Sequence, residues 1–319
     1  MAITTLIPAY KVRYLEEVLV SLKHQSLRPE RIIISDDSPD RAFITAFQAD
    51  EIKSAAQGLD VEVIEGPRAG GLANCRHLLD VWNGATPLVH LLFDDDIIYP
   101  EFYSIHAAAH ESGMFDCSVS RRWTALESGQ PVSQLERPRM VAQHPQRLMS
   151  LASDTLFSLT IPGCQNWLGE YSNAVINREA ANLIMETQMA GVSYEGLGDI
   201  GLFLAASLKK PVCYINDPLG FFRTHAQQVS QQTSGHAFKL AVLAWAALAV
   251  AGYRIGKLSQ EQAAQCFQMV SDTLLRGYKD VPEMVRFSSL LRELAAGVPS
   301  SEEKFVQHWH AFVPGTSGE

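Results

Sequence analysis

The strongest constraint on the fold is the alternation of apolar, strand-like runs with amphipathic helical segments over the first hundred residues. Four short apolar runs are typical of buried strands: residues 3–8, 31–35, 61–64 and 88–93. Between the first two runs, Leu15, Val18, Leu19 and Leu22 recur at the spacing of one helix face. Because strands that alternate with helices form mainly parallel sheets, the sequence predicts an α/β fold.

Polar residues follow three of these runs, at the point where each predicted strand ends. The clusters are Pro8-Ala9-Tyr10, the SDDSPD segment that contains Asp36 and Asp37, and the FDDD segment that contains Asp94, Asp95 and Asp96. Ligands of open α/β sheets bind outside the carboxyl ends of the strands. We therefore expect the three clusters to lie at one edge of the sheet.

Composition excludes several classes of function. The 319-residue chain has 26 basic and 35 acidic residues and a net charge of -9, with no dense Lys/Arg run, so we expect no nucleic-acid partner. The five cysteines are scattered and form no CxxC pair, which argues against a cysteine zinc site and favours a reducing compartment. The amino-terminal residues lack the basic and long apolar regions of a signal peptide.

The chain divides by composition near residue 233. Residues 1–233 are predicted to form the α/β domain, with one half at about 1–116 and a second at about 117–233, and residues 234–319 a helical region. Four prolines interrupt residues 117–165, which are predicted to be less regular. The most apolar run, residues 240–253, is shorter than the roughly 20 residues of a membrane span. We interpret it as a buried core helix, with membrane-surface contact as the alternative.

The FDDD segment carries the main chemical signal. Carboxylates at Asp94 and Asp96, two residues apart after a buried strand, can meet one hard cation such as Mg²⁺ or Mn²⁺. Such a cation offsets the charge that develops on a leaving diphosphate. The alternative is a solvated acidic turn.

Five further residues have a functional and a structural interpretation, and the first three are Asp36, Asp37 and Arg76. Asp36 or Asp37 can accept hydrogen bonds from a base or ribose, or can form an Asx-turn or helix cap. Arg76 can reach a phosphate from the first turns of a helix, or can be a surface arginine.

Asp199 and His225 are the other candidates. Asp199 stands where a helix is predicted to begin, as a general base or as the helix cap. His225 can ligate the metal or contact the diphosphate, or can be a surface histidine.

Taken in order, these segments resemble glycosyltransferase family 2, whose members have the GT-A fold. The resemblance covers roughly residues 3–231 and rests on LIPAYK, SDDSPD, GLANCRH, FDDD, EYSNAVINREA, LGDIGLF and RTHAQQVS. It implies a Rossmann-like, mostly parallel sheet flanked by helices, here with an all-helical carboxyl-terminal extension. Gly198 stands where the family frequently has Glu, so Asp199 alone would serve as base.

The resemblance also implies an activity: a single displacement with inversion at the anomeric carbon of a nucleotide-diphosphate sugar, with uridine diphosphate as the expected donor nucleotide. The implied donor-binding residues are Pro8, Ala9, Tyr10, Asp36 or Asp37, Arg76 and, at the ribose or sugar, Asp95. Asp94, Asp96 and His225 would hold Mg²⁺ or Mn²⁺, and Asp199 would deprotonate the acceptor hydroxyl. Gln165, Asn166 and Trp167 are the candidates for the acceptor side, because an aromatic ring packs well against a sugar.

Two other functions stay open at this level: a GT-A-like nucleotidyltransferase, whose glycine-rich signature after the first strand is missing, and a non-catalytic nucleotide-binding or scaffold protein. The expected acceptor is a sugar, lipid-linked or other hydroxyl in bacterial polysaccharide or glycoconjugate synthesis. The expected location is the cytoplasm, with the inner face of the membrane as a variant. The carboxyl-terminal helices could contact the membrane peripherally or form a homo-oligomer.

Overall fold

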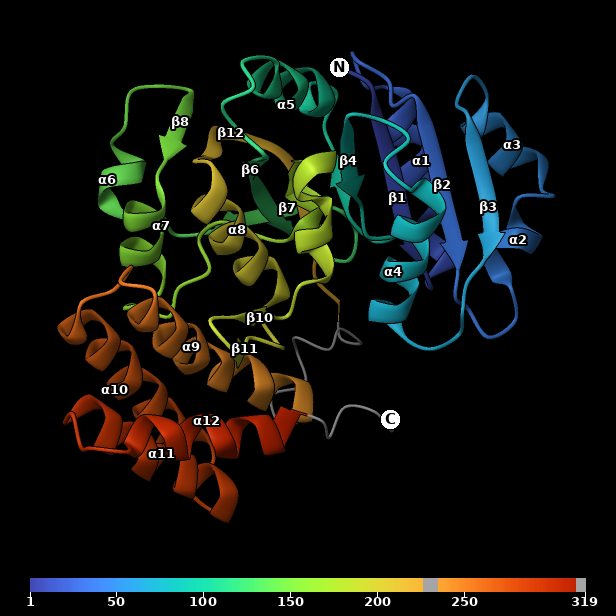
Figure 1. Ribbon diagram of the computed structural model, residues 1–319. Coiled ribbons are helices and arrows are strands. Elements are labelled where there is room, and N and C mark those ends of the chain that lie inside the picture. The colour runs from blue at the N-terminus through green and yellow to red at the C-terminus, as the bar shows by residue number, and fades with distance from the viewer. Residues whose placement is uncertain (226–234, 314–319) are drawn as a thin grey trace. The chain divides into compact units, whose positions relative to one another are not determined.

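The computed structural model describes residues 1–225 and 235–313 (Figure 1). The chain forms two compact units. The first contains residues 1–151, 168–185 and 209–225, and the second contains residues 152–167, 186–208 and the described part of 226–319. The two units are therefore interleaved along the chain, and the predicted boundary near residue 233 lies outside the described residues.

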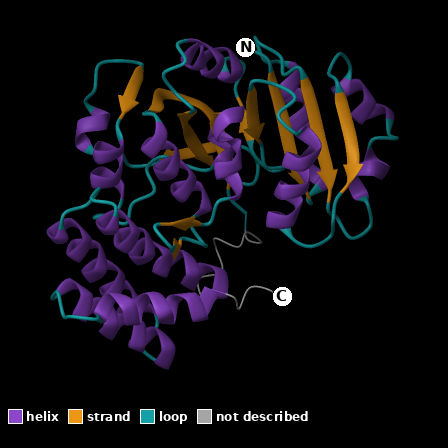
Figure 2. Ribbon diagram, viewed as in Figure 1, coloured by secondary structure: helices purple, strands orange, loops and turns teal. Residues whose placement is uncertain are grey.

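A ten-stranded sheet organises the first unit (Figure 2). The strand order is β3-β2-β1-β4-β9-β6-β12-β5, with β7 beside β6 and β8 beside β12. The strands are β1 Ile3–Ala9, β2 Arg31–Asp36, β3 Val61–Glu65, β4 Leu88–Leu91, β5 Ile97–Ile98, β6 Cys117–Ala125, β7 Pro131–Gln134, β8 Leu148–Leu151, β9 Ala174–Asn177 and β12 Val212–Arg223. Strands β3, β2, β1 and β4 pair in parallel, and β12 pairs in parallel with β6. The remaining pairs of this sheet are antiparallel, so the predicted α/β architecture is confirmed as a mixed sheet.

Helices connect the strands of this sheet. They are η1 Val12–Tyr14, α1 Leu15–Lys23, α2 Ala42–Ala46, α3 Asp50–Ala56, α4 Gly71–Trp82, α5 Phe102–Glu111, α6 Arg139–Ala142, η2 Tyr171–Asn173 and η3 Arg178–Met185. The predicted apolar face of α1 is confirmed, since Leu15, Val18, Leu19 and Leu22 are all buried. Burying a side chain of this kind contributes about 1.5–3 kcal/mol.

The segment after α5 is more regular than its sequence predicts. Residues Cys117–Ala125 form β6, although this strand carries serines and arginines among its apolar residues. Buried Ser118 is satisfied by helix α5: its Oγ lies 2.7 Å from His106 Nδ1 and 2.9 Å from His110 Nε2. The prediction of irregular structure is wrong here, because partners on α5 and the carbonyl of Val175 make this polar side chain compatible with a buried strand.

The second unit consists of helices and one small hairpin. Its elements are α7 Ser153–Thr160, β10 Gln188–Met189, β11 Val192–Ser193, α8 Gly198–Lys209, α9 His236–Arg254, α10 Gln260–Gly277, α11 Pro282–Ala295 and α12 Ser301–Phe312. Sequence signals fix two of the helix starts. Ser259 and Gln262 form a capping box before α10, and Pro282 occupies the first turn of α11.

Helix α9 contains the most apolar run of the chain. It is the one helix of the described residues that is long and apolar enough to cross a bilayer, judged by length and composition only. Its residues from Leu243 to Gly252 are all buried, and it packs against α10, α12 and β11 within the same unit. A core helix that is mostly buried passes the same test of length and composition as a membrane span. The burial of α9 therefore supports its prediction as a core helix.

Three buried histidines make the first unit sensitive to acid. Burial lowers the pKa of His90 on β4 to about 4, from an ordinary value of 6.5, and lowers the pKa of His106 and His110 on α5 as well. Nδ1 of His90 lies 2.8 Å from the hydroxyl of Tyr103, so the neutral ring is held in a hydrogen bond. Below pH 6.5 the unfolded chain binds protons at these positions that the folded chain does not.

We therefore predict that the contribution of these histidines to the free energy of unfolding is largest above pH 6.5 and falls as the pH drops from 6.5 towards 4. At pH 5.5 His90 alone costs about 1.4 kcal/mol. Urea denaturation at pH 7.5 and pH 5.5 measures the loss, which should be smaller in His90→Gln by about 1 kcal/mol. The exposed His24 supplies the control: His24→Gln should keep the wild-type loss, and an equal loss in all three proteins would contradict the prediction.

Candidate active site

The carboxyl ends of β1, β2 and β4 lie side by side in the first unit. Ala9 at the end of β1 is in register with Asp36 at the end of β2, and the amide of Asp37 donates to the carbonyl of Ala9 at 2.9 Å. On its other side β1 pairs with β4 up to Leu91, three residues before Asp94. The expectation that the polar clusters gather at one edge of the sheet is confirmed for these three strand ends.

Asp94 joins the end of β1 to the loop after β4. Its Oδ2 accepts the backbone N–H groups of Tyr10 and Lys11, both at 2.5 Å. Burial raises the pKa of Asp94 to about 6, opposed by these two hydrogen bonds. One oxygen of this predicted metal ligand is thus committed to the backbone of the first strand end.

Asp95 lies between two side chains that can carry positive charge. It is nearly buried, and its Oδ2 accepts Lys11 Nζ at 2.5 Å and lies 3.1 Å from Nε2 of His225. His225 itself is buried, so its interpretation as a surface histidine is wrong. The remainder of its motif, residues 226–231, lies outside the described residues.

Asp96 is the most enclosed of the three aspartates. Its Oδ1 accepts the backbone N–H of Arg223 at 3.1 Å, and its exposed fraction is 2%. Burial raises its pKa well above the ordinary value, the charge of Asp95 raises it further, and a hydrogen bond from the Ser172 side chain works against both. The interpretation of FDDD as a solvated acidic turn is wrong, since all three aspartates are buried.

Arg223 is a structural residue of the site that the sequence did not single out. Its Nε donates to the carbonyl of Asp95 at 3.0 Å and its Nη1 to the carbonyl of Glu127 at 2.6 Å. Its guanidinium also lies 4.3 Å from the ring centre of Tyr14 and pairs with Glu17 at 2.7 Å. Arg223 stands two residues before His225 in the same motif, which is the signal that could have identified it.

A second group of side chains lies beside Asp96, at and just before η2. Glu170 accepts Nε and Nη2 of Arg122 at 2.7 and 2.5 Å, and its charge also raises the pKa of Asp96. Ser172 Oγ accepts the backbone N–H of Phe93 at 3.0 Å. These residues line a cavity of about 10 Å³ beside Asp96, which holds at most about one water molecule.

The two acidic residues after β2 have different contacts. Asp36 accepts Ser38 N and Ser38 Oγ through Oδ1, at 3.0 and 2.5 Å, and Ile44 N through Oδ2 at 3.0 Å. Asp37 accepts Arg68 N through Oδ1 at 2.5 Å. The structural interpretation therefore holds for Asp36, which closes the turn and the start of α2 as an Asx-turn does. Whether either side chain also contacts a donor stays a prediction.

Gly66, directly after β3, lies against the backbone at the end of β2. Its amide donates to the carbonyl of Asp36 at 2.9 Å. A Cβ at this position would lie 2.8 Å from Oδ1 of Asp37 and 2.9 Å from the carbonyl oxygen of Asp36. Only glycine lets the backbone approach the end of β2 this closely.

The remaining predicted donor-binding residues of the first unit differ in exposure. Pro8 and Ala9 are buried in β1, whereas Tyr10 is 59% exposed and Arg76 is exposed in α4. A tyrosine side chain this exposed is available for contact with a ligand.

The other four predicted site residues belong to the second unit. Asp199 lies in the first turn of α8, half-buried, and its Oδ1 accepts the backbone N–H of Ile200 at 3.0 Å. Gln165 and Asn166 are half-buried, whereas Trp167 is buried and donates its indole N–H to Thr160 Oγ1 at 3.1 Å. Their roles as base and acceptor contacts stay predictions.

The described residues contain no group of three or more His, Cys, Asp and Glu side chains arranged to hold a metal ion. Asp94 and Asp96 are buried carboxylates two residues apart in the loop after β4. Mg²⁺ is often bound by only one or two carboxylates together with substrate phosphates and water, so this pair is compatible with such a cation.

Comparison with known proteins decides the family. Residues 4–165, just over half of the chain, match the family model described as glycosyl transferase family 2. The chain belongs to glycosyl transferase family 2. The enzyme is therefore a glycosyltransferase, and the scaffold and nucleotidyltransferase alternatives receive no support from this match. No curated protein sequence matches the chain.

Solved structures support the fold of this family 2 member. TarS from S. aureus matches with a TM-score of 0.51 at 15% identity, over 96% of this chain and 55% of that chain. Its 1–349 portion matches with the same TM-score and identity, over 99% of this chain and 92% of that chain. The same portion of TarS in complex with UDP-GlcNAc matches with a TM-score of 0.50 at 14% identity, over 99% and 92%. The chain thus spans about half of the longer TarS chain.

The contacts of Asp36 predict a large loss of stability when its carboxylate is removed. Asp36→Ala leaves three donors without their acceptor, two of them backbone N–H groups in a buried turn. We expect the free energy of unfolding to fall by about 2–3 kcal/mol, measured by urea denaturation. Asp40→Ala, in the same turn but exposed, should change it by less than about 0.5 kcal/mol. Equal effects of the two substitutions would contradict a structural role for Asp36.

Proposed function

We propose that this glycosyltransferase transfers a sugar from a nucleotide-diphosphate donor to an acceptor hydroxyl, with inversion at the anomeric carbon. One observation carries the proposal: the aspartates that follow β4 are held against the end of β1 by backbone and ionic contacts, in a chain of glycosyl transferase family 2. Carboxyl ends of neighbouring parallel strands are the usual place for a nucleotide.

The proposed donor is a uridine diphosphate sugar. This nucleotide is the family expectation, and the structures of TarS in complex with UDP-GlcNAc and with UDP support it. We assign its binding to Pro8, Ala9, Tyr10, Asp36 or Asp37, Arg76 and Asp95. Among these, Asp37 and Tyr10 fit best, because Asp36 is engaged by the turn of its own loop while Tyr10 is largely exposed.

A divalent cation, Mg²⁺ or Mn²⁺, is the proposed cofactor. When bound, it would offset the negative charge that develops on the departing diphosphate. Asp94 and Asp96 would hold it with hard oxygen ligands, and His225 would assist. Burial disfavours the ionised form of both aspartates, so a nearby cation would stabilise the charged carboxylates that the site otherwise destabilises.

In the proposed reaction the acceptor oxygen attacks the anomeric carbon on the face opposite the diphosphate. The new carbon–oxygen bond forms as the bond to the diphosphate oxygen breaks, and the hydroxyl proton passes to the carboxylate of Asp199. Gln165 and Asn166 are the proposed acceptor contacts, and Trp167 would support them through packing, since its ring is buried.

The proposed acceptor is a sugar, lipid-linked or other hydroxyl compound, and the proposed location is the cytoplasm or the inner face of the membrane. All five cysteines are free, which supports a reducing compartment. The helices α9–α12 remain the proposed region for peripheral membrane contact or for homo-oligomerisation.

Donor binding is tested by thermal unfolding with UDP-sugars, with and without Mn²⁺. Ligand that binds only the folded state should raise the melting temperature by about 5 °C at a hundredfold excess over its Kd. Asp96→Asn should abolish the part of the shift that requires Mn²⁺, whereas Asp80→Asn, exposed on α4, should keep it. No shift with any nucleotide sugar would refute the proposed donor class.

The role of Asp199 is tested separately from donor binding. Asp199→Asn keeps the side-chain size and an oxygen for the Ile200 amide but removes the base. We expect it to bind the donor as the wild type does and to lose about 10²–10⁴-fold in the rate of transfer or of donor hydrolysis. Asp272→Asn, exposed on α10, is the matched control and should keep both. Full activity in Asp199→Asn would rule out its role as base.

A further inference from the structure

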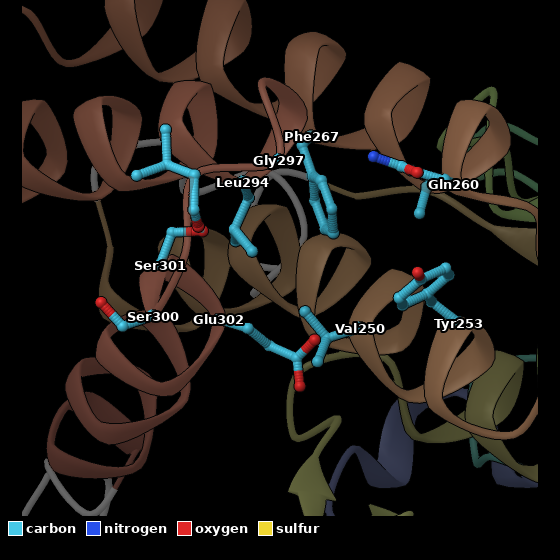
Figure 3. Close-up of a pocket in the computed structure, with 11 residues that line it drawn as sticks. Val250, Tyr253, Gln260, Phe267, Leu294, Gly297, Ser300, Ser301 and Glu302 are labelled. Atoms are coloured by element: carbon cyan, nitrogen blue, oxygen red, sulfur yellow. The ribbon is translucent and has the colours of Figure 1, made fainter.

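The helical unit contains a cavity that no residue of the candidate active site lines. Its volume is about 210 Å³, far more than the roughly 10–15 Å³ that one water molecule requires. Helices α9, α10, α11 and α12 and the loop between α11 and α12 form its wall (Figure 3).

The side chains at the cavity combine aromatic rings with hydrogen-bonding groups. In Figure 3 the ring of Phe267 and the carboxylate of Glu302 approach the space from opposite sides, with Gln260 and Tyr253 at one end. Tyr253 is 46% exposed, so much of its ring is available for contact. At the other end Ser300 and Ser301 supply hydroxyl groups.

The backbone keeps one side of the cavity open. Gly297 follows the last turn of α11 with φ +69°, a left-handed conformation that favours glycine. A Cβ at this position would lie 3.2 Å from Nε2 of Gln260. The absence of a side chain at residue 297 therefore leaves the amide of Gln260 accessible.

The charge at the cavity favours a neutral ligand. Glu302 is the one acidic or basic side chain among the residues that line it, and its Oε1 already accepts Nε of Arg254 at 2.8 Å. An anion would be repelled by this carboxylate, and a cation would have to compete with Arg254. A hydroxyl group can donate to the carboxylate without either cost.

We propose that this cavity binds a neutral sugar unit. The ring of Tyr253 offers a flat apolar surface for the C–H face of a sugar, and Phe267 closes the apolar side. Glu302 and Gln260 offer the acceptor and donor groups that the hydroxyls of a sugar require. Ligand sites with this combination of apolar wall and few polar groups are common in proteins.

The proposal goes beyond the proposed transfer reaction, because every residue that lines the cavity lies between Val250 and Glu302, outside the candidate active site. Binding at this cavity requires neither the donor nor Asp199. A glycosyltransferase with such a cavity would hold a sugar of a longer acceptor or product in addition to the reacting one.

Saturation-transfer difference NMR on the full chain tests the proposal with glucose and N-acetylglucosamine as probes. We expect the sugar ring protons to receive saturation from the wild-type protein. Tyr253→Ala and Gln260→Ala should each weaken binding, by about tenfold for the loss of the aromatic surface. Glucose 6-phosphate should bind no better than glucose, because the cavity contains a carboxylate.

Both substitutions are at exposed positions, and Met269→Ala, exposed on α10 outside the cavity, is the matched control. Met269→Ala should bind both sugars as the wild type does. The proposal would be overturned by the absence of saturation transfer to either sugar. It would also be overturned if the Tyr253→Ala and Gln260→Ala variants both showed the same transfer as the wild type. Donor-dependent thermal shift and donor hydrolysis should be unchanged in Tyr253→Ala. The absence of sugar binding at this cavity is therefore distinguishable from a failure of the proposed transfer reaction.

Discussion

Two backbone N–H groups on one carboxylate oxygen determine the arrangement of the candidate active site. Tyr10 and Lys11 donate to Oδ2 of Asp94, and this contact joins the end of β1 to the loop after β4. Charge-assisted hydrogen bonds of this type are among the stronger ones in proteins. Because Asp95 and Asp96 follow directly in the chain, the contact also fixes where their side chains begin. Lys11 adds a second link through its ammonium group to Asp95.

The described side chains around the three aspartates offer them few positive charges. Lys11 pairs with Asp95, but the guanidinium of Arg223 pairs with Glu17 and that of Arg122 with Glu170. Backbone N–H groups supply the contacts of Asp94 and Asp96 instead, together with the side chain of Ser172 at Asp96. Burial then raises the pKa of both carboxyl groups. A cation bound beside these carboxyl groups would oppose this rise in their pKa, and this is the physical argument for the proposed metal dependence.

The sequence was sufficient for features that depend on local pattern and insufficient for those that depend on distant partners. The apolar run at residues 31–35 and the apolar face of α1 predicted a buried strand and its neighbouring helix, and FDDD predicted a polar strand end. Strand β6 was missed, because its buried serines are satisfied by histidines of helix α5 and by carbonyl groups of Val175 and Asn173, more than fifty residues along the chain. Arg223 was missed for the same reason, since its partners lie roughly one hundred or more residues away along the chain.

The interleaving of the two units constrains how the chain can be synthesised and divided. The first unit has all of its segments once residue 225 is in place, whereas the second still lacks α9–α12 at that point. Segments of the second unit that precede residue 225 depend on those late helices: Phe157 of α7 packs against Gly252, and the carbonyl of Ser193 accepts the indole N–H of Trp309. A nascent or proteolysed chain that ends before α9 would therefore expose apolar surface from the middle of the sequence. Neither unit can be excised as one continuous stretch.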